Sequence, residues 1–462
     1  MFHRIFDEGL AHSSYVVACD RTREAAVVDP RRDVDVYVQL AAQRGLTVTH
    51  TIDTHIHADF VSGSRELAAG GARVIAGPGA NLGFASHEVT DGEVLAIGDV
   101  RLRVLHTPGH TPEHISLLFR EGETDRVLTG DTLFVGAVGR PDLLGEDRSR
   151  ELAGQLHASL MEKLLALPDE VEVHPAHGAG SLCGTAIGSE PHSTIGRERR
   201  RNPMLRHESR EAFIAAVLED LPETPAYFAE LKRVNRTGPL LLDLTAGVPA
   251  LPVLSAQSAD AAMRDGAVLL DLRASEAFTE GHAAGAISIA FGPRVGYWAA
   301  WVVPLERRVL LISDGDVRHA EEAHRQLLRV GIDRVEGLVH GGFPAWRAAA
   351  LPVSRLRRIT AAELIDLHAE RPLTIVDVRS APEFAAGHAD GAINVPVGSI
   401  PADMPPVPRG AGIAVMCESG FRSTLAASLL ARAGFSSVVN VSGGMAAYRE
   451  AQGRRTSPAS GV

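Results

Sequence analysis

The chain has 462 residues with a net charge of −11, and 45% of its residues are hydrophobic. This length is enough for three domains with well-filled cores, and the charge argues against an extended nucleic-acid-binding surface. The three cysteines are too scattered for a disulfide framework, and no apolar run has the length of a membrane span or the form of a signal peptide, so we expect a cytoplasmic protein without a membrane partner.

The first chemically informative segment follows a predicted strand over Thr47–Ile52 and reads His55-Ile56-His57-Ala58-Asp59. Two imidazoles and a carboxylate so close in sequence can converge on one cation when they lie on the loop that leaves a strand. Neutral imidazole and carboxylate suit first-row divalent metals. The segment therefore predicts a metal site at the end of this strand.

Three later loops also place candidate ligands after short apolar runs. A single His is more often structural than a ligand, whereas four such loops in one order form a strong signal. Over about the first half of the chain they resemble the metallo-β-lactamase fold, which implies an αββα sandwich. The later loops read His106-Thr107-Pro108-Gly109-His110, Thr129-Gly130-Asp131-Thr132-Leu133 and His174-Pro175-Ala176-His177-Gly178.

Position 60 departs from the pattern of the two-metal hydrolases of that superfamily, in which a further His ends the first motif. Phe60 cannot ligate a metal. A second metal site would keep only Asp59, His177 and a share of Asp131, which is a poor basis for a bridged hydroxide. We therefore expect one metal, with Asp59 and His177 outside its ligand shell.

The best matched ligand set is His55, His110 and Asp131, and two imidazoles with one carboxylate and open positions are typical of non-haem Fe(II) oxygenases. Here the sequence resembles the persulfide dioxygenases. The resemblance implies one Fe(II) per chain, which binds O2 and a persulfide whose outer sulfur is oxidised to sulfite as the thiol is released. It also implies that His57 lies beside the metal, and we rank His57 last among four metal ligands. Arg140 falls on the family's substrate-facing loop.

Cys183 follows His177 by six residues in a Gly-rich stretch. Two interpretations stay open: a catalytic thiol that positions or accepts a persulfide, and a small apolar filler under a Gly turn.

The rest of the chain contains an internal repeat of α/β units. Both copies resemble rhodanese domains. The predicted domains are residues 1–246 for the metal domain, 253–353 for the first rhodanese-like copy and 359–453 for the second. The repeated landmarks are Leu270-Asp271-Leu272-Arg273 with Val376-Asp377-Val378-Arg379, and Gly341-Gly342-Phe343 with Gly443-Gly444-Met445.

In the second copy a predicted strand, Gly412–Met416, delivers Cys417 to the start of a helix predicted over residues 423–433. Backbone N–H groups, the helix dipole and Arg422 would lower the thiol pKa and hold a transferred sulfur as the persulfide. We predict Cys417 and Arg422 as catalytic residues, against the alternative of an inert buried Cys. The substrate-binding loop is predicted to be Glu418, Ser419, Gly420 and Phe421.

In the first copy the same place, after Val309–Ile312, reads Ser313-Asp314-Gly315-Asp316-Val317-Arg318. Ser cannot hold a transferable sulfur, and the two carboxylates would oppose an anionic sulfur species. We therefore predict a rhodanese-like domain without sulfurtransferase activity, whose role is packing and orienting.

The prediction for the whole chain is a sulfide-detoxifying enzyme that oxidises a low-molecular-weight persulfide with O2 to sulfite and passes sulfur through Cys417 to give thiosulfate. The carrier thiol stays open among glutathione, coenzyme A, bacillithiol and cysteine, and a homo-oligomer is compatible with the sequence. Two alternatives remain. One is a zinc-dependent thioester hydrolase of glyoxalase II type, which needs a second metal, and the other is a sulfur carrier whose metal domain is silent.

Overall fold

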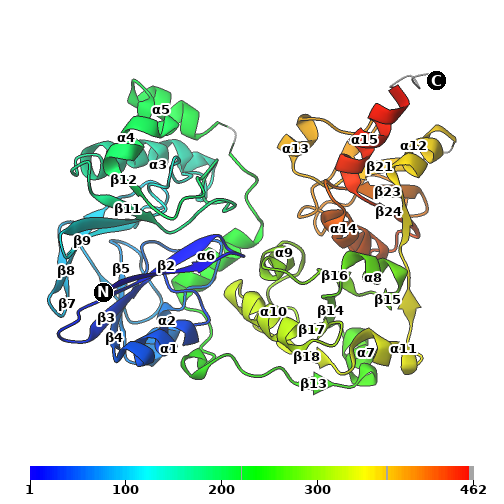
Figure 1. The fold of residues 1–462 in the computed structure, drawn as a ribbon, viewed down its shortest axis with the longest axis horizontal. Coiled ribbons are helices and arrows are strands. Elements are labelled where there is room, and N and C mark those ends of the chain that lie inside the picture. The colour runs from blue at the N-terminus through cyan, green and yellow to red at the C-terminus, as the bar shows by residue number, and fades with distance from the viewer. Residues whose placement is uncertain (220, 371–372, 457–462) are drawn as a thin grey trace, which may run out of the picture. The chain divides into compact units, whose positions relative to one another are not determined.

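The computed structural model describes residues 1–219, 221–370 and 373–456 (Figure 1). The chain forms two compact units. The first contains residues 1–249 and 328–331, and the second contains the described residues of 250–327 and of 332 onward. No helix in these described ranges is long and apolar enough to span a membrane.

The first unit has two six-stranded sheets. In both sheets each strand lies beside the next strand along the chain. The first sheet contains β1 (Phe2–Asp7), β2 (His12–Ala18), β3 (Glu24–Val28), β4 (Thr47–Ile52), β5 (Arg73–Ala76) and β6 (His87–Glu88). The second contains β7 (Val94–Ile97), β8 (Val100–His106), β9 (Ile115–Glu121), β10 (Thr124–Gly130), β11 (Glu172–Pro175) and β12 (Ser193–Thr194).

Helices cover the outer face of each sheet, with α1 and α2 on one side and α3, α4 and α5 on the other (Figure 1). The α-helices are α1 (Asp35–Arg44), α2 (Ser64–Ala69), α3 (Glu146–Ala158), α4 (Ile195–Arg201), α5 (Arg210–Val217) and α6 (Tyr227–Thr237). Three shorter helical segments are η1 (Ser159–Leu164), η2 (Pro203–Arg206) and η3 (Leu244–Ala246).

The alternation of side chains along β2 shows why two layers of core form. Tyr15 and Val17 belong to the core between the two sheets, whereas Val16 and Ala18 belong to the core beneath α1 and α2. Successive residues of a strand point to opposite faces, so β2, which is buried at every position, is covered on both faces. This confirms the predicted αββα sandwich.

The four predicted metal loops leave the carboxyl ends of β4, β8, β10 and β11. β4 is parallel to β3 and β5, and β10 is parallel to β11. The positive backbone angle of Gly130 (φ 48°) and the approach of His114, whose Nε2 would lie 2.5 Å from a Cβ at that position, exclude a side chain just before Asp131. Parallel strands therefore carry most of the candidate ligands to one edge of the sandwich.

The second unit has two five-stranded sheets with the same topology, and both are parallel throughout. The first, in spatial order, contains β13 (Val253–Leu254), β18 (Val335–Val339), β17 (Val309–Ile312), β14 (Val268–Asp271) and β16 (Ile287–Ser288). The second contains β20 (Arg357–Ile359), β24 (Ser437–Val441), β23 (Gly412–Met416), β21 (Leu373–Asp377) and β22 (Ile393–Asn394). A two-stranded sheet pairs β15 (His282–Ala283) with β19 (Val353–Ser354).

Helices flank these sheets, as expected for parallel strands that are joined by crossover connections. The two predicted rhodanese-like α/β domains are confirmed, and the predicted helix after Cys417 is observed two residues earlier, as α14. The first copy carries α7 (Ala256–Arg264), α8 (Ser275–Glu280), α9 (Val295–Val302), α10 (Val317–Arg329) and α11 (Gly342–Ala348). The second carries α12 (Ala361–Glu370), α13 (Ala381–Ala385), α14 (Phe421–Arg432) and α15 (Gly444–Thr456).

Candidate functional site

Three buried donor side chains, His55, His110 and Asp131, converge at the edge of the sandwich. Asp131 Oδ2 lies 3.7 Å from His55 Nε2 and 3.5 Å from His110 Nε2. His55 Nε2 and Asp131 Oδ2 are buried and have no hydrogen-bond partner among the described residues. Buried polar atoms are almost always partnered, so this group fits a cation held between the three donor atoms.

The charge states of the three side chains also suit a metal. Burial lowers the pKa of His55 and of His110, so both imidazoles are neutral and can ligate. Burial alone would raise the pKa of Asp131, but the neighbouring His177 and His55 hold it well below its usual range. The site therefore offers two neutral imidazoles and one carboxylate.

Neighbouring groups fix the direction of each donor. His55 Nδ1 lies 3.0 Å from Thr54 Oγ1, and His110 Nδ1 lies 2.8 Å from the carbonyl oxygen of Arg140, so both histidines turn Nε2 toward the site. The backbone N–H of Asp131 donates to His114 Nε2 at 2.9 Å. No sequence motif singled out His114, although it ends a series of histidines with four-residue spacing that starts at His106.

His57, the fourth predicted metal ligand, lies outside this group of three donors. Its ring centroid is 4.2 Å from that of His55, and its buried Nδ1 has no hydrogen-bond partner among the described residues. His57 Nε2 lies 3.1 Å from Asp29 Oδ1, and the two form a separate group with Asp53. Asp29 Oδ1 also accepts the Thr54 N–H at 2.7 Å, just before the loop that carries His55 and His57. Asp29 itself has a positive φ of 49°, which is uncommon for a residue other than Gly. Burial opposes protonation of His57, but the Asp29 carboxylate raises its pKa, so His57 serves as a partner of Asp29.

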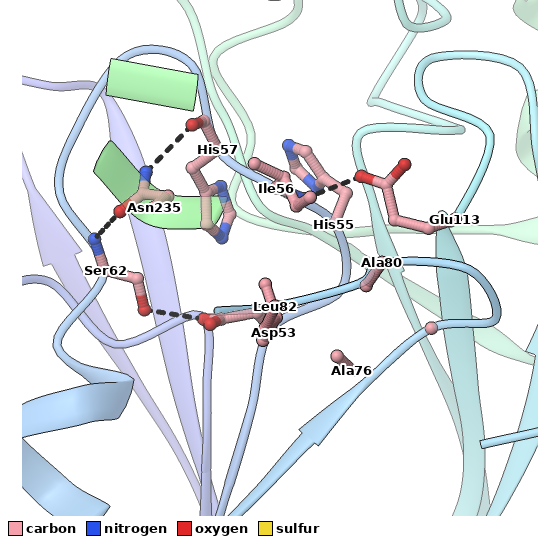
Figure 2. Close-up of a pocket in the computed structure, with 11 residues that line it drawn as sticks. Asp53, His55, Ile56, His57, Ser62, Ala76, Ala80, Leu82, Glu113 and Asn235 are labelled. Carbon is pink, nitrogen blue, oxygen red and sulfur yellow. Dashed lines mark hydrogen bonds between the residues drawn. The ribbon is translucent and has the colours of Figure 1, made fainter. Parts of the chain in front are cut away.

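Asn235 on α6 holds the loop that carries His55 (Figure 2). Its Oδ1 accepts the N–H of Ser62 at 2.9 Å, and its Nδ2 donates to the carbonyl oxygens of His57 at 2.9 Å and Phe60 at 2.8 Å. No sequence signal pointed to Asn235, because it lies far from the loop along the chain.

Asp59, His177 and Cys183 form a further buried group beside Asp131. His177 Nε2 lies 2.9 Å from Asp59 Oδ2, and His177 Nδ1 lies 2.8 Å from Asp131 Oδ1. Burial raises the pKa of the Cys183 thiol to about 12, and the side chain packs with Phe134, Ala137 and Ile187. Cys183 thus lies at the site as a buried thiol.

Phe60 contributes an apolar ring to the same region. Its ring centroid lies 4.3 Å from those of both His12 and His57, and the side chain is fully buried. Neither ring nitrogen of His12 has a hydrogen-bond partner in the part of the chain that the structure describes. No pattern around His12 marked it as a site residue in the sequence.

Arg140, predicted to face the substrate, is buried, with an exposed fraction of 1%. Its guanidinium forms hydrogen bonds with Asp142, the carbonyl oxygens of Leu182 and Pro222, and Thr224 Oγ1. These contacts engage all three nitrogens of the buried guanidinium and tie three segments of the chain together, and this geometry does not support the predicted substrate contact.

Cys417 lies directly after β23, at the start of the loop that leads into α14. Its Sγ accepts the Gly420 N–H at 3.0 Å and lies 3.5 Å from Ser423 Oγ. Arg422 forms two hydrogen bonds with Glu383, at 2.6 and 2.7 Å, and this pairing lowers the pKa of Glu383 to about 2. The guanidinium therefore anchors the loop to α13, while the backbone N–H of Gly420 donates to the sulfur.

The corresponding loop of the first copy carries no sulfur. Ser313 follows β17, and its Oγ accepts the Gly315 N–H at 3.3 Å. Asp316 pairs with Arg318 on the surface. Both loops join a strand to a helix, but the donating Gly lies two residues after Ser313 and three residues after Cys417. The first loop offers no nucleophile that can carry sulfur.

Replacing Asp131 by Ala tests the metal group. Because the carboxylate faces both imidazoles, we expect Asp131→Ala to lower the bound metal per chain by at least about 10-fold. Elemental analysis of the purified protein gives this value. Asp125→Ala is the matched control, since Asp125 lies on β10, the strand that ends just before Asp131, and pairs with Arg120 at the surface. Equal metal contents of the two variants would refute the assignment.

Replacing Asn235 by Ala tests whether its hydrogen bonds to His57, Phe60 and Ser62 hold the loop that follows β4. The change leaves two buried carbonyl oxygens and one N–H without this partner, which costs about 2–4 kcal/mol of stability. We expect a lower Tm and weaker metal binding, measured by calorimetry and by chelator competition. Thr237→Ala, at the exposed end of α6, is the control. An unchanged Tm and metal affinity would show that the loop does not depend on Asn235.

Comparisons with known proteins agree with this division of the chain. The family model of the metallo-beta-lactamase superfamily matches residues 7–177, and the rhodanese-like domain model matches residues 255–349 and 360–451. A crystal structure of a metallo-beta-lactamase from Staphylococcus aureus subsp. aureus COL is 32% identical, with a TM-score of 0.65, and the match covers 73% of this chain and 98% of that one.

Relatives of the metal domain carry two different activities in their names. Hydroxyacylglutathione hydrolase of Gloeobacter violaceus is 32% identical over 47% of this chain and 93% of the relative. Persulfide dioxygenase ETHE1, mitochondrial, of Homo sapiens is 28% identical over 44% of this chain and 76% of the relative. The chain belongs to the metallo-β-lactamase superfamily through its first domain and continues into two rhodanese-like domains.

Proposed function

We propose that the chain oxidises a low-molecular-weight persulfide at the group of His55, His110 and Asp131 and transfers sulfane sulfur at Cys417. The observation that carries the proposal is one set of three buried donors with unpartnered atoms, in the same chain as a cysteine on a rhodanese-like loop. The persulfide dioxygenase among the relatives is consistent with it.

His55, His110 and Asp131 would hold one Fe(II), which supplies the redox chemistry that couples O2 to oxidation of the outer sulfur. The balanced reaction takes one persulfide, one O2 and one water to one thiol, one sulfite and two protons. His177 holds Asp131 Oδ1 at 2.8 Å, so Oδ2 stays directed at the two imidazoles. His114, which accepts the N–H of Asp131, fixes the same carboxylate from its backbone.

At the second site, the Cys417 thiolate attacks the outer sulfur of a persulfide. The new bond joins Sγ to that sulfur, the old sulfur–sulfur bond breaks, and its electron pair leaves with the thiolate product. Sulfite then attacks the outer sulfur of the Cys417 persulfide, giving thiosulfate and restoring the thiolate. The Gly420 N–H donates to Sγ, with 3.0 Å between nitrogen and sulfur, and would stabilise negative charge on that sulfur during the transfer.

The product of the first site is thus the sulfur acceptor of the second. Joining both sites in one chain raises the effective concentration of each for the product of the other. This explains why the two activities occur together without requiring a channel.

Oxygen uptake by iron-loaded protein with glutathione persulfide tests the proposal, with sulfite and thiosulfate measured together. We expect uptake with thiosulfate as the main product in the unmodified protein. Cys417→Ser should keep the uptake but accumulate sulfite, because the acceptor step is lost, and Asp131→Ala should abolish uptake. If iron-loaded protein takes up no O2, the proposed dioxygenase reaction is refuted. The remaining hypothesis is then a sulfur carrier whose metal domain is silent.

A two-metal thioester hydrolase is the second candidate, because Asp59, His177 and Cys183 offer three further donor atoms within 4.8 Å of one another. Cys183 would supply the donor that Phe60 lacks. This candidate predicts two zinc ions per chain and hydrolysis of S-lactoylglutathione, both lowered by Cys183→Ala. One metal per chain with no hydrolysis excludes it.

A further inference from the structure

A polar pocket of about 230 Å³ lies beside the Cys417 loop in the second unit. Gly420 and Phe421 of the loop line it, and the Gly420 N–H is 3.0 Å from Cys417 Sγ. The pocket therefore reaches the backbone that holds the reactive sulfur. Asn440, at the end of β24, and Arg358, on β20, line its other sides.

The catalytically silent copy also contributes to this pocket. Ser275 and Glu276, at the start of α8, are part of its lining. The two copies are in contact within the unit: the Ser288 N–H donates to Ser428 Oγ at 3.1 Å in a buried position, and Arg432 donates to the Gly285 carbonyl oxygen at 2.8 Å. Glu276 is thus held at the pocket by a packed interface, and the first copy does more than orient its neighbour.

The lining carries one charge of each sign and one unpartnered acceptor. Glu276 Oε1 lies 3.9 Å from Arg358 Nη2, and both side chains are open to solvent, with exposed fractions of 65% and 37%. Asn440 is buried, its Nδ2 donates to Thr424 Oγ1 at 2.8 Å, and its Oδ1 has no hydrogen-bond partner among the described residues. An acceptor left without a partner in such a position favours a ligand that brings an N–H donor.

These groups match an amino acid in its charged form. An ammonium group would satisfy Glu276 or Asn440 Oδ1, and a carboxylate would pair with Arg358. A small dianion such as thiosulfate offers no donor to either acceptor and is repelled by the Glu276 carboxylate.

We propose that this pocket binds the amino-acid moiety of a zwitterionic thiol or its persulfide, and that Glu276 of the silent copy selects such a donor over small anions. The inference rests on the proposed sulfur transfer at Cys417 and names its substrate class. Transfer is the step given above: the Cys417 Sγ–S bond forms, the donor S–S bond breaks, and the thiolate product leaves with that electron pair.

Sulfur transfer from glutathione persulfide and from thiosulfate to cyanide, measured side by side in the full-length protein, tests this assignment. We expect Glu276→Gln to raise the KM for glutathione persulfide about fivefold with little change in kcat, and to leave the KM for thiosulfate equal or lower. Glu276→Asp should restore part of the loss. Glu280→Gln, at the exposed end of the same helix, is the matched control.

Equal effects of Glu276→Gln on both donors, or no effect on either, would overturn the selection by Glu276. Calorimetric binding of glutathione to the Cys417→Ser protein separates this result from failure of the proposed function. If the unmodified protein transfers sulfur from neither donor, the proposed role of Cys417 fails. Glutathione binding that Glu276→Gln weakens would still support the pocket, and absence of binding would refute it.

Discussion

The carboxylate of Asp131 is the contact on which the metal domain depends. One oxygen lies 2.8 Å from His177 Nδ1, the other faces His55 and His110, and the backbone N–H of the same residue donates to His114. These four partners come from three loops at the edge of the sandwich, because His110 and His114 share the loop between β8 and β9. A buried carboxylate surrounded in this way stays charged because its neighbours stabilise that charge, and its free oxygen is then available to a cation.

The surroundings of this carboxylate determine how many metals the site can hold. His177 is already hydrogen bonded on both ring nitrogens, to Asp131 and to Asp59. Phe60 packs beside these groups with a ring that has no atom able to ligate a metal. A second cation would have to displace the contact between His177 and Asp59. The buried Cys183 thiol is protonated at neutral pH and would first have to lose its proton. Both requirements favour one metal.

The sequence predicted the sandwich, both rhodanese-like copies and the grouping of His55, His110 and Asp131, because each follows from a local pattern: a strand, then a loop with a ligand. It did not predict partners that tertiary packing brings in. Asn235 reaches the metal loop from a helix far along the chain, and Asp29 reaches His57 from the end of another strand. For the same reason the sequence did not show that Asp29 holds His57 Nε2 or that Arg140 bonds to Leu182 and Thr224, since motif position says nothing about where a side chain points.

The two rhodanese-like copies share one topology and differ at the residue that carries sulfur. The shared topology persists without that residue, and Ser275 and Glu276 of the first copy line the pocket beside Cys417.

The proposed oxidation of a persulfide takes place in the metal domain, and the stoichiometry of that reaction tests the proposal most directly. In iron-loaded Cys417→Ser protein given a limiting amount of glutathione persulfide, the account predicts one O2 consumed and one sulfite formed per persulfide. Release of glutathione without consumption of O2 would contradict it.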